Sequence, residues 1–409
     1  MTSKRLLLLA ATTGYQTQMF AEAASALGLN VVMATDRCHV LNDPWGDHAV
    51  PVRFEQPENA AIELSRLSPP IDALVAIGDR PTTIAALTAQ RLGIPYHSIE
   101  AVEASRNKFL ARERFGAAGL PVPRFVRVPL ERPSNPIGYP CVLKPLGLSG
   151  SRGVVRANSE AEFVEAFARI RAILQNPEIL RLAERQDRYI QVEEFVEGRE
   201  FALEGIVTAG RLQTLAIFDK PDPLDGPYFE ETIYVTPSRE PDQQRLIDAT
   251  QRAITGLGLT HGPIHAEMRL NHAGVWMLEV AARPIGGLCA RALRFDGGAV
   301  SLEELILRHA LGEDVGGLRR EGAASGVMMI PIPQSGIYRG VQGVAKAAAI
   351  AEVVITAKEG QHLLRLPEGS SYLGFLFSRR STPGEVEDDL RRAHAELQFD
   401  IARHLAVVR

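Results

Sequence analysis

The chain has 409 residues, 45% of them hydrophobic and 23% charged, which is the composition of an ordinary globular protein with two or three domains. Its formal net charge of -4 gives no reason to expect a nucleic-acid partner or a membrane surface. The 3 cysteines (Cys38, Cys141 and Cys289) are far apart and form no Cys-x-x-Cys pair, so buried thiols are expected rather than disulfides or a zinc site.

The sequence begins with a Lys4-Arg5 pair and a run of leucines at 6–9. This apolar run is too short for a signal peptide, and no apolar stretch of the sequence is long enough to cross a bilayer. We therefore expect a buried first strand and a cytoplasmic protein with no membrane partner.

The first hundred residues alternate strand and helix patterns, which indicates a doubly wound parallel sheet with ligands near the C-terminal ends of its strands. The turn at 11–14, Ala-Thr-Thr-Gly, lacks the Gly-x-Gly-x-x-Gly pattern, so no dinucleotide site is expected. Strands are predicted at 5–11, 31–34, 73–77 and 94–96, and helices at 15–27 and from Pro81 onward.

A compact α+β region follows a predicted helix at 106–118, and a β-rich region that we expect to be a separate module begins near residue 321. The predicted domains are an N-terminal one at 1–105, a second at 106–315 with a lid at about 122–196, and a C-terminal one at 316–409. The remaining strands are predicted at 140–144, 189–195, 200–207, 212–218, 261–270 and 275–280, and the remaining helices at 160–175, 301–311 and 383–397.

The strongest local signal is a lysine that ends a predicted strand and is followed by a loop rich in glycine and serine. Small residues expose backbone N–H groups that can wrap phosphate oxygens, and Lys144 adds a positive charge. No Gly-Lys-Ser/Thr sequence closes the loop, so it is not a Walker A loop. A flexible hairpin tip beside a surface lysine is the alternative. The candidates are Lys144, Ser149, Gly150, Ser151 and Gly153.

Two glutamates on the predicted hairpin near residue 270 are candidate metal ligands. Period-two alternation places Glu267 on one strand face, away from the core. If the hairpin closes with a loop of odd length, such as 272–274, Glu267 falls opposite Glu279. Facing carboxylates repel unless a cation lies between them, and oxygen ligands suit Mg²⁺. A loop of even length would instead favour two solvated glutamates on opposite faces.

Two further segments carry weaker signals. Arg283 follows Glu279 by four residues and precedes Pro-Ile-Gly-Gly, where an arginine can reach a phosphate or a developing oxyanion, or can be a surface ion-pair partner. The segment 191–200, Gln-Val-Glu-Glu-Phe-Val-Glu-Gly-Arg-Glu, ends one strand and begins another. Backbone groups there could bind an adenine edge and a carboxylate could bind ribose, although spacing alone favours a charged hairpin.

In their order along the chain, these segments resemble the ATP-grasp superfamily over roughly residues 1–315. The family has a pre-grasp α/β domain, a lid with a lysine and a small-residue loop, two acidic metal ligands, and an arginine before Gly-Gly. The resemblance implies an α/β and α+β architecture: an ATP-grasp fold with an N-terminal doubly wound parallel-sheet domain, a mobile lid, an antiparallel-sheet grasp core and a β-rich C-terminal module.

The resemblance also implies how ATP would be bound. Lys108 and Lys144 would contact its phosphates under the loop at 149–153, and Glu200 would hold the ribose. The adenine would be held by Glu193, Glu194, Phe195 and Val196.

Two glutamates and an arginine are the implied catalytic residues. Glu267 and Glu279 would bind Mg²⁺, with Mn²⁺ as an alternative, and Arg283 would stabilise the transferred phosphate and the tetrahedral intermediate. Many family members have Glu-x-Asn at the second acidic position, whereas Ala281 stands here where the asparagine would bind metal. A Glu-x-x-x-Arg form resembles the L-amino-acid ligase branch, which makes dipeptides, and the residues from about Gly326 onward resemble that branch's extra domain.

The stretch at 231–238 resembles the segment Glu-(small)-x-His-x-x-Pro-Ser that lines the amino-acid pocket of that branch. Glu231 fits the glutamate, which is expected to hold a substrate ammonium, and Tyr234 stands in place of the histidine. The Pro/Gly-rich stretch at 220–227 fits a mobile substrate loop, and an ordinary polar loop is the alternative. The substrate candidates are Lys220, Glu231, Tyr234, Arg283, Gly286 and Gly287.

The activity implied by the resemblance is that of an ATP-dependent carboxylate–amine ligase. It would form an amide through an acyl phosphate and release ADP and phosphate, with small-molecule carboxylate and amine substrates, one of them an amino acid. A homodimer through the first domain is common among such proteins. The alternatives are an ATP-grasp carboxylase or nucleotide-biosynthesis ligase, and an ATP-binding regulatory protein without turnover, which the missing asparagine would favour. A scaffold protein is permitted by composition, but no feature favours it.

Overall fold

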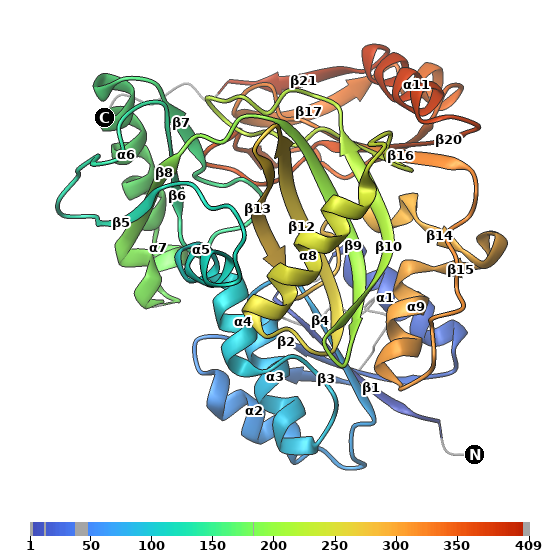
Figure 1. Ribbon diagram of the computed structural model, residues 1–409. Coiled ribbons are helices and arrows are strands. Elements are labelled where there is room, and N and C mark those ends of the chain that lie inside the picture. The colour runs from blue at the N-terminus through green and yellow to red at the C-terminus, as the bar shows by residue number, and fades with distance from the viewer. Residues whose placement is uncertain (1–2, 12–13, 37–47, 183, 404–409) are drawn as a thin grey trace.

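The computed structural model describes residues 3–11, 14–36, 48–182 and 184–403 (Figure 1). Cys38 lies outside these described residues, as do Thr12 and Thr13 of the first turn. Cys141 and Cys289 are buried free thiols, as predicted. Within the described ranges, no helix combines the length and the apolar character that a bilayer-spanning segment needs.

The N-terminal residues form the predicted parallel sheet, in the order β3 (Ala49–Pro51), β2 (Asn30–Thr35), β1 (Arg5–Ala10) and β4 (Ala73–Ile77). The leucines of β1 are buried on both faces of this sheet. Leu6 and Leu8 pack toward α1 (Tyr15–Ala26), whereas Leu7 and Leu9 pack toward α2 (Pro57–Ser65) and α3 (Pro81–Leu92). Burial on both faces explains the unbroken apolar run, and the doubly wound arrangement is confirmed.

The predicted strand at 94–96 is wrong, because its backbone groups are used elsewhere. The N–H of Ile94 donates to Ala89 O at the end of α3, Pro95 has no N–H, and Tyr96 O accepts from Thr260 Oγ1 at 3.1 Å. Next come α4 (Ile99–Arg106) and α5 (Lys108–Ala117).

The lid is a four-stranded antiparallel sheet covered by α6 (Glu160–Leu174), and it lies beside the rest of the molecule in green (Figure 1). Phe163, Phe167 and Ile170 of α6 pack on the sheet around Leu143 and Val192. The strand order is β5 (Phe125–Pro129), β8 (Tyr189–Glu194), β6 (Cys141–Pro145), β7 (Val155–Ala157), and the short helices are α7 (Pro177–Leu180) and η1 (Arg185–Arg188).

An eight-stranded antiparallel sheet forms the centre of the molecule. The helix α8 (Gln243–Leu257), with α4 and α5, covers one of its faces. The strand order is β13 (Gly274–Ala281), β12 (Gly262–Asn271), β9 (Arg199–Thr208), β10 (Arg211–Lys220), β11 (Ile233–Thr236), β16 (Ala324–Ile330), β20 (Gly374–Arg380), β18 (Glu352–Ile355).

The C-terminal residues are rich in strands, as predicted, and three of these strands join the central sheet. The strands β16, β20 and β18 extend the central sheet, because Ser325–Met328 of β16 pair with the whole of β11. The other C-terminal elements are α10 (Val344–Ala348), α11 (Pro383–Ala395) and a sheet of β19 (His362–Leu363), β17 (Gly336–Gln342) and β21 (Gln398–Ala402). Before them lie η2 (Cys289–Ala292), β14 (Arg294–Phe295), η3 (Asp296–Gly298), β15 (Val300–Ser301) and α9 (Leu302–Ala310).

Candidate active site

A cavity of about 410 Å³ lies where the N-terminal sheet, the lid, the central sheet and the C-terminal residues meet. Its lining includes Asp79 after β4, Glu267 on β12 and Tyr372 before β20. All candidate site residues predicted from the sequence line this cavity except Gly153 and Lys220, which are buried beside it. The fold therefore brings sequence signals that are far apart in the chain to one place.

The hairpin of β12 and β13 places Glu267 directly opposite Glu279, as predicted. The predicted route to this pairing is wrong, because the strands close through a two-residue loop at 272–273. An even loop alone would turn the glutamates to opposite faces. A β-bulge at Leu278 adds one residue to β13 and restores the alignment, so that both glutamates line the cavity.

Three neighbours hold Glu267 through a single oxygen. Its Oε1 lies 3.1 Å from His265 Nε2, 3.2 Å from Lys220 Nζ and 3.2 Å from the Tyr234 hydroxyl. Burial by itself would raise the pKa of Glu267, but Lys220 and His265 hold that pKa well below its usual value. The residue is therefore a carboxylate, and its second oxygen can face an ion without breaking these contacts.

The donor set at the paired glutamates fits Mg²⁺. Glu267 and Glu279 offer hard carboxylate oxygens from adjacent strands, and Glu279 Oε2 lies 3.5 Å from Lys108 Nζ. Ala281 pairs with His265 at the end of the same hairpin and offers no side-chain oxygen. A bound ion would therefore complete its coordination with water and phosphate oxygens.

A buried carboxylate on β9 supports this hairpin and was missed in the sequence. Glu204 faces His265 across the sheet and contacts its Nδ1, and its other oxygen accepts from Ile285 N–H at 3.1 Å. Burial lowers the pKa of His265, but Glu204 and Glu267 overcome this and raise it to about 9. The signal for Glu204 was its period-two spacing from Glu200, which puts both on one strand face.

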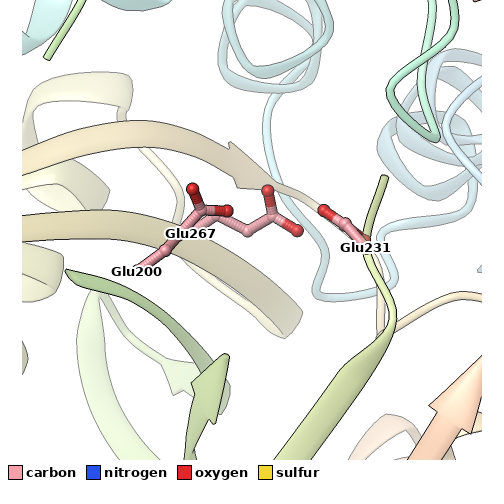
Figure 2. A group of neighbouring side chains, drawn as sticks. All are labelled: Glu200, Glu231 and Glu267. Atoms are coloured by element: carbon pink, nitrogen blue, oxygen red, sulfur yellow. The ribbon is translucent and has the colours of Figure 1, made fainter. Parts of the chain in front are cut away.

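Three carboxylates converge on the ammonium of Lys220. Figure 2 shows these three glutamates, Glu200, Glu231 and Glu267, as neighbouring side chains. The Nζ lies 2.8 Å from Glu200, 2.9 Å from Glu231 and 3.2 Å from Glu267. The three glutamates are close enough together to hold a metal ion, but the lysine already supplies the cation. Lys220 was predicted to contact substrate, and it instead lies buried behind Glu231.

Glu231 stands at the edge of this cluster. Its Oε2 accepts from the Tyr234 hydroxyl at 2.8 Å, and its Oε1 accepts from Lys220. Burial and the neighbouring Glu267 charge raise the pKa of Glu231 to about 7, against the opposing effect of Lys220. The side chain lines the cavity, so it can accept a further cationic group from a ligand.

The lid lysine is fixed by a buried charge network that was also missed. Lys144 contacts Glu193, and Glu193 accepts a two-pronged contact from Arg112 of α5, at 2.9 Å from Nε and 3.1 Å from Nη2. Burial raises the pKa of Glu193, but Arg112 and Lys144 overcome this and hold it at about 2. Arg112 is 0% exposed, and no local pattern marked it.

The loop at 147–153 connects β6 and β7 over the cavity. Lys108 at the start of α5 donates to Leu148 O at 2.6 Å, which ties this lysine to the loop. Gly153 has φ +74, and a Cβ there would approach Pro145 within 2.7 Å. Glycine is therefore required at this position, where the loop turns back against its own strand.

Residues 193–196 border the cavity, and some of their side chains also form ion pairs with neighbouring arginines or lysines. Phe195 lines the cavity and is flanked by Arg156, whose guanidinium carbon lies 4.0 Å from the ring centre. Glu194 also borders the cavity but forms an ion pair of 2.6 Å with Arg124. Glu200 uses both oxygens, one for Lys220 and one for Arg269 at 3.0 Å.

Arg283 is held by a residue of the N-terminal sheet. Asp79, directly after β4, accepts from Arg283 Nε at 3.0 Å and from Nη2 at 3.3 Å. Burial raises the pKa of Asp79, but Arg283 overcomes this and lowers it. Asp79 was not predicted as a site residue, although its place at the C-terminal end of a parallel strand was the available signal.

The fold is the ATP-grasp fold, and two family models match parts of the chain. The ATP-grasp domain family matches residues 137–292, and the family described as L-amino acid ligase C-terminal domain 2 matches residues 328–402. The chain therefore has an ATP-grasp domain followed by an L-amino acid ligase C-terminal domain, and the predicted fold class is confirmed.

Particular relatives agree with this assignment. The crystal structure of an L-amino acid ligase from Bacillus licheniformis superposes with a TM-score of 0.82 at 25% identity, covering 98% of this chain and 99% of that one. The alanine–anticapsin ligase of Bacillus subtilis is 29% identical over 49% of this chain and 46% of its own length. Dapdiamide A synthase of Enterobacter agglomerans is 26% identical over 55% of this chain and 53% of its own. The chain thus spans about half the length of these two curated relatives.

Proposed function

We propose that this protein is an ATP-dependent ligase that joins a carboxylate to an amine, with an amino acid as one substrate. The observation that carries the proposal is the pairing of Glu267 and Glu279 across one hairpin, with Lys108, Lys144 and Arg283 lining the same cavity. This charge set suits phosphoryl transfer, in which positive groups offset the charge on the moving phosphoryl.

In the proposed reaction, a carboxylate oxygen attacks the γ-phosphorus of ATP. The bond between the γ-phosphorus and the β-γ bridging oxygen breaks, and ADP leaves. The amine then attacks the acyl carbon, the carbon–oxygen bond to phosphate breaks, and the amine loses a proton. Glu267 and Glu279 would hold Mg²⁺, which supplies charge neutralisation at the phosphates when bound. Arg283, held by Asp79, can donate to the oxyanion of the tetrahedral intermediate.

Glu231 supports an amino acid as one substrate, because its carboxyl group lines the cavity and its oxygens can accept hydrogen bonds from an ammonium group. Beside it lies an apolar wall that includes Tyr15 and Tyr372, whose rings pack at 5.6 and 6.2 Å from that of Phe375. Burial raises the pKa of Tyr372, and the nearby Glu231 raises it further. An amino acid bound through its ammonium would therefore place an apolar side chain against this wall.

The test is ADP and amide formation from ATP and Mg²⁺ across pairs of amino acids, simple acids and amines. ADP, phosphate and amide that appear only with particular pairs, including an apolar amino acid, are the expected result. Glu279→Gln is expected to abolish this turnover while the variant stays folded, because an amide lacks the ligand charge. Formation of AMP would refute the acyl phosphate, and tight ATP binding without turnover would favour a regulatory protein.

A further inference from the structure

One segment of the C-terminal domain reaches across to the lid. This segment, residues 366–372, connects β19 to β20, and we name it the latch segment. Its Pro367 O accepts from Gly153 N–H at 2.9 Å, and its Glu368 O accepts from Arg152 Nε at 2.9 Å. The loop at 147–153 is thus bonded to a part of the chain more than two hundred residues away.

A side-chain contact lies next to these backbone contacts. The Glu368 carboxylate accepts from Arg169 of the lid helix α6, at 3.0 Å from Nε and at 2.8 and 3.0 Å from Nη2. The remaining Nη1 of Arg169 donates to the Tyr228 hydroxyl, in the loop that leads to Glu231. One guanidinium therefore joins the lid, the segment between β10 and Glu231, and the latch segment.

This geometry differs from an ordinary surface ion pair. An isolated exposed pair contributes little to stability, whereas a two-pronged arginine–carboxylate contact fixes orientation as well. Here the pair is partly buried, with 26% of the Arg169 side chain and 38% of the Glu368 side chain exposed. The latch segment also continues into Ser370 and Tyr372, which line the same cavity as Ser149 and Gly150 of the lid loop.

We propose that Glu368 and Arg169 are positioning residues that hold the lid closed over ATP and keep water from the acyl phosphate. The proposal rests on the ligase function argued above. An acyl phosphate that meets water is hydrolysed, so ATP is consumed without amide. Lid closure here depends on the C-terminal domain, which gives that domain a part in coupling ATP use to amide formation.

A charge-swap experiment tests the latch. Glu368→Arg and Arg169→Glu are each expected to raise ADP formed per amide several-fold and to raise KM for ATP, because like charges then face each other. The double variant, which restores opposite charges, is expected to recover most of the coupling. Arg308→Glu, which breaks an ion pair of similar exposure on α9, is the control and should leave the ratio unchanged.

A second measurement does not require turnover. Gly153 N–H is bonded to the latch segment, so hydrogen exchange of the peptide 147–154 should be slow in the wild type with ATP bound and faster in Glu368→Arg. Unchanged exchange and an unchanged ADP-to-amide ratio in the single variants would overturn the latch. Absence of ADP with every substrate pair, with exchange still altered by Glu368→Arg, would refute the ligase function and leave the latch standing.

Discussion

At the scale of single residues, the least expected feature is the contact between Arg283 and Asp79. The two are separated by 204 positions in sequence, yet the Asp79 carboxylate accepts hydrogen bonds from both Nε and Nη2 of the guanidinium. A guanidinium held in this way is pre-oriented toward the cavity, and such pre-orientation is what electrostatic stabilisation of a transition state requires.

We predict that Asp79→Asn lowers kcat by about tenfold or more, equivalent to about 1.4 kcal/mol, with a smaller change in the KM for ATP. The amide keeps the shape but loses the charge that orients Arg283. Steady-state kinetics with separate kcat and KM values checks this. Asp79→Glu, which retains the charge, should recover part of the rate, and a loss confined to KM would contradict the positioning role.

Gly286 offers a direct test of the proposed apolar side-chain site. It lines the cavity, and a Cβ at this position would meet no atom within 4 Å. We predict that Gly286→Leu fills the space and lowers kcat/KM for large apolar amino acids by about tenfold to a hundredfold, while glycine and alanine are spared. Gly322→Leu, at an exposed position with equally open space, is the control. Equal losses for small and large amino acids would place the side chain elsewhere.

At the scale of elements, the β12–β13 hairpin shows what the sequence can and cannot reveal. Alternation of polar and apolar residues correctly predicted the face that carries Glu267. It could not reveal the bulge, because an apolar Leu278 suits a regular strand equally well. The bulge depends on a distant partner: Arg112 Nη1 donates to Leu278 O at 2.8 Å and to Met277 O at 3.1 Å.

Arg112 therefore joins two elements of the site, the lid strand that bears Glu193 and the bulge that aligns Glu279. We predict that Arg112→Leu destabilises the protein by about 3 to 5 kcal/mol, since it removes one of the two cationic partners of the buried Glu193 carboxylate and the donor to the bulge. Urea unfolding followed by tryptophan fluorescence measures the loss. Arg114→Leu, an exposed arginine on the same helix, is the control, and equal stability of the two variants would refute the network.

At the scale of the whole molecule, the limit of sequence reasoning lies in how the parts join. The strand and helix patterns predicted a β-rich C-terminal region, but β11 and β16 are separated in sequence by the hairpin and α9, and their pairing leaves no local trace. The central sheet, the latch segment and the Asp79 contact all connect regions that sequence reasoning had treated as separate. Local sequence patterns predict a single helix or strand. Contacts between elements that are distant in sequence depend on both partners, and neither composition nor periodicity reveals which residues pair.

One such contact between regions distant in sequence involves a group of histidines. His97, between α3 and α4, accepts through Nδ1 from the N–H groups of Thr260 and His261 at 3.1 and 3.2 Å. His261 stacks on His309 of α9 with ring centres 4.3 Å apart. Burial lowers the pKa of His97 to about 3 and that of His309 to about 4. Both are therefore neutral in the folded protein, and protonation of His97 Nδ1 would break its two accepted hydrogen bonds.

The direction of the pH effect follows from these values. Unfolded histidine has a pKa of about 6.5, so below that pH the unfolded chain binds protons that the folded one excludes. The stability contributed by the neutral histidines is present above about pH 6.5 and is lost as pH falls toward about 4. We predict that the Tm of the double variant His97→Gln, His309→Gln falls less than that of the wild type when the pH is lowered from 7.5 to about 5, because glutamine does not titrate. Parallel Tm curves for the two proteins across this range would show that these histidines carry no proton linkage, since other acid-labile groups affect both equally.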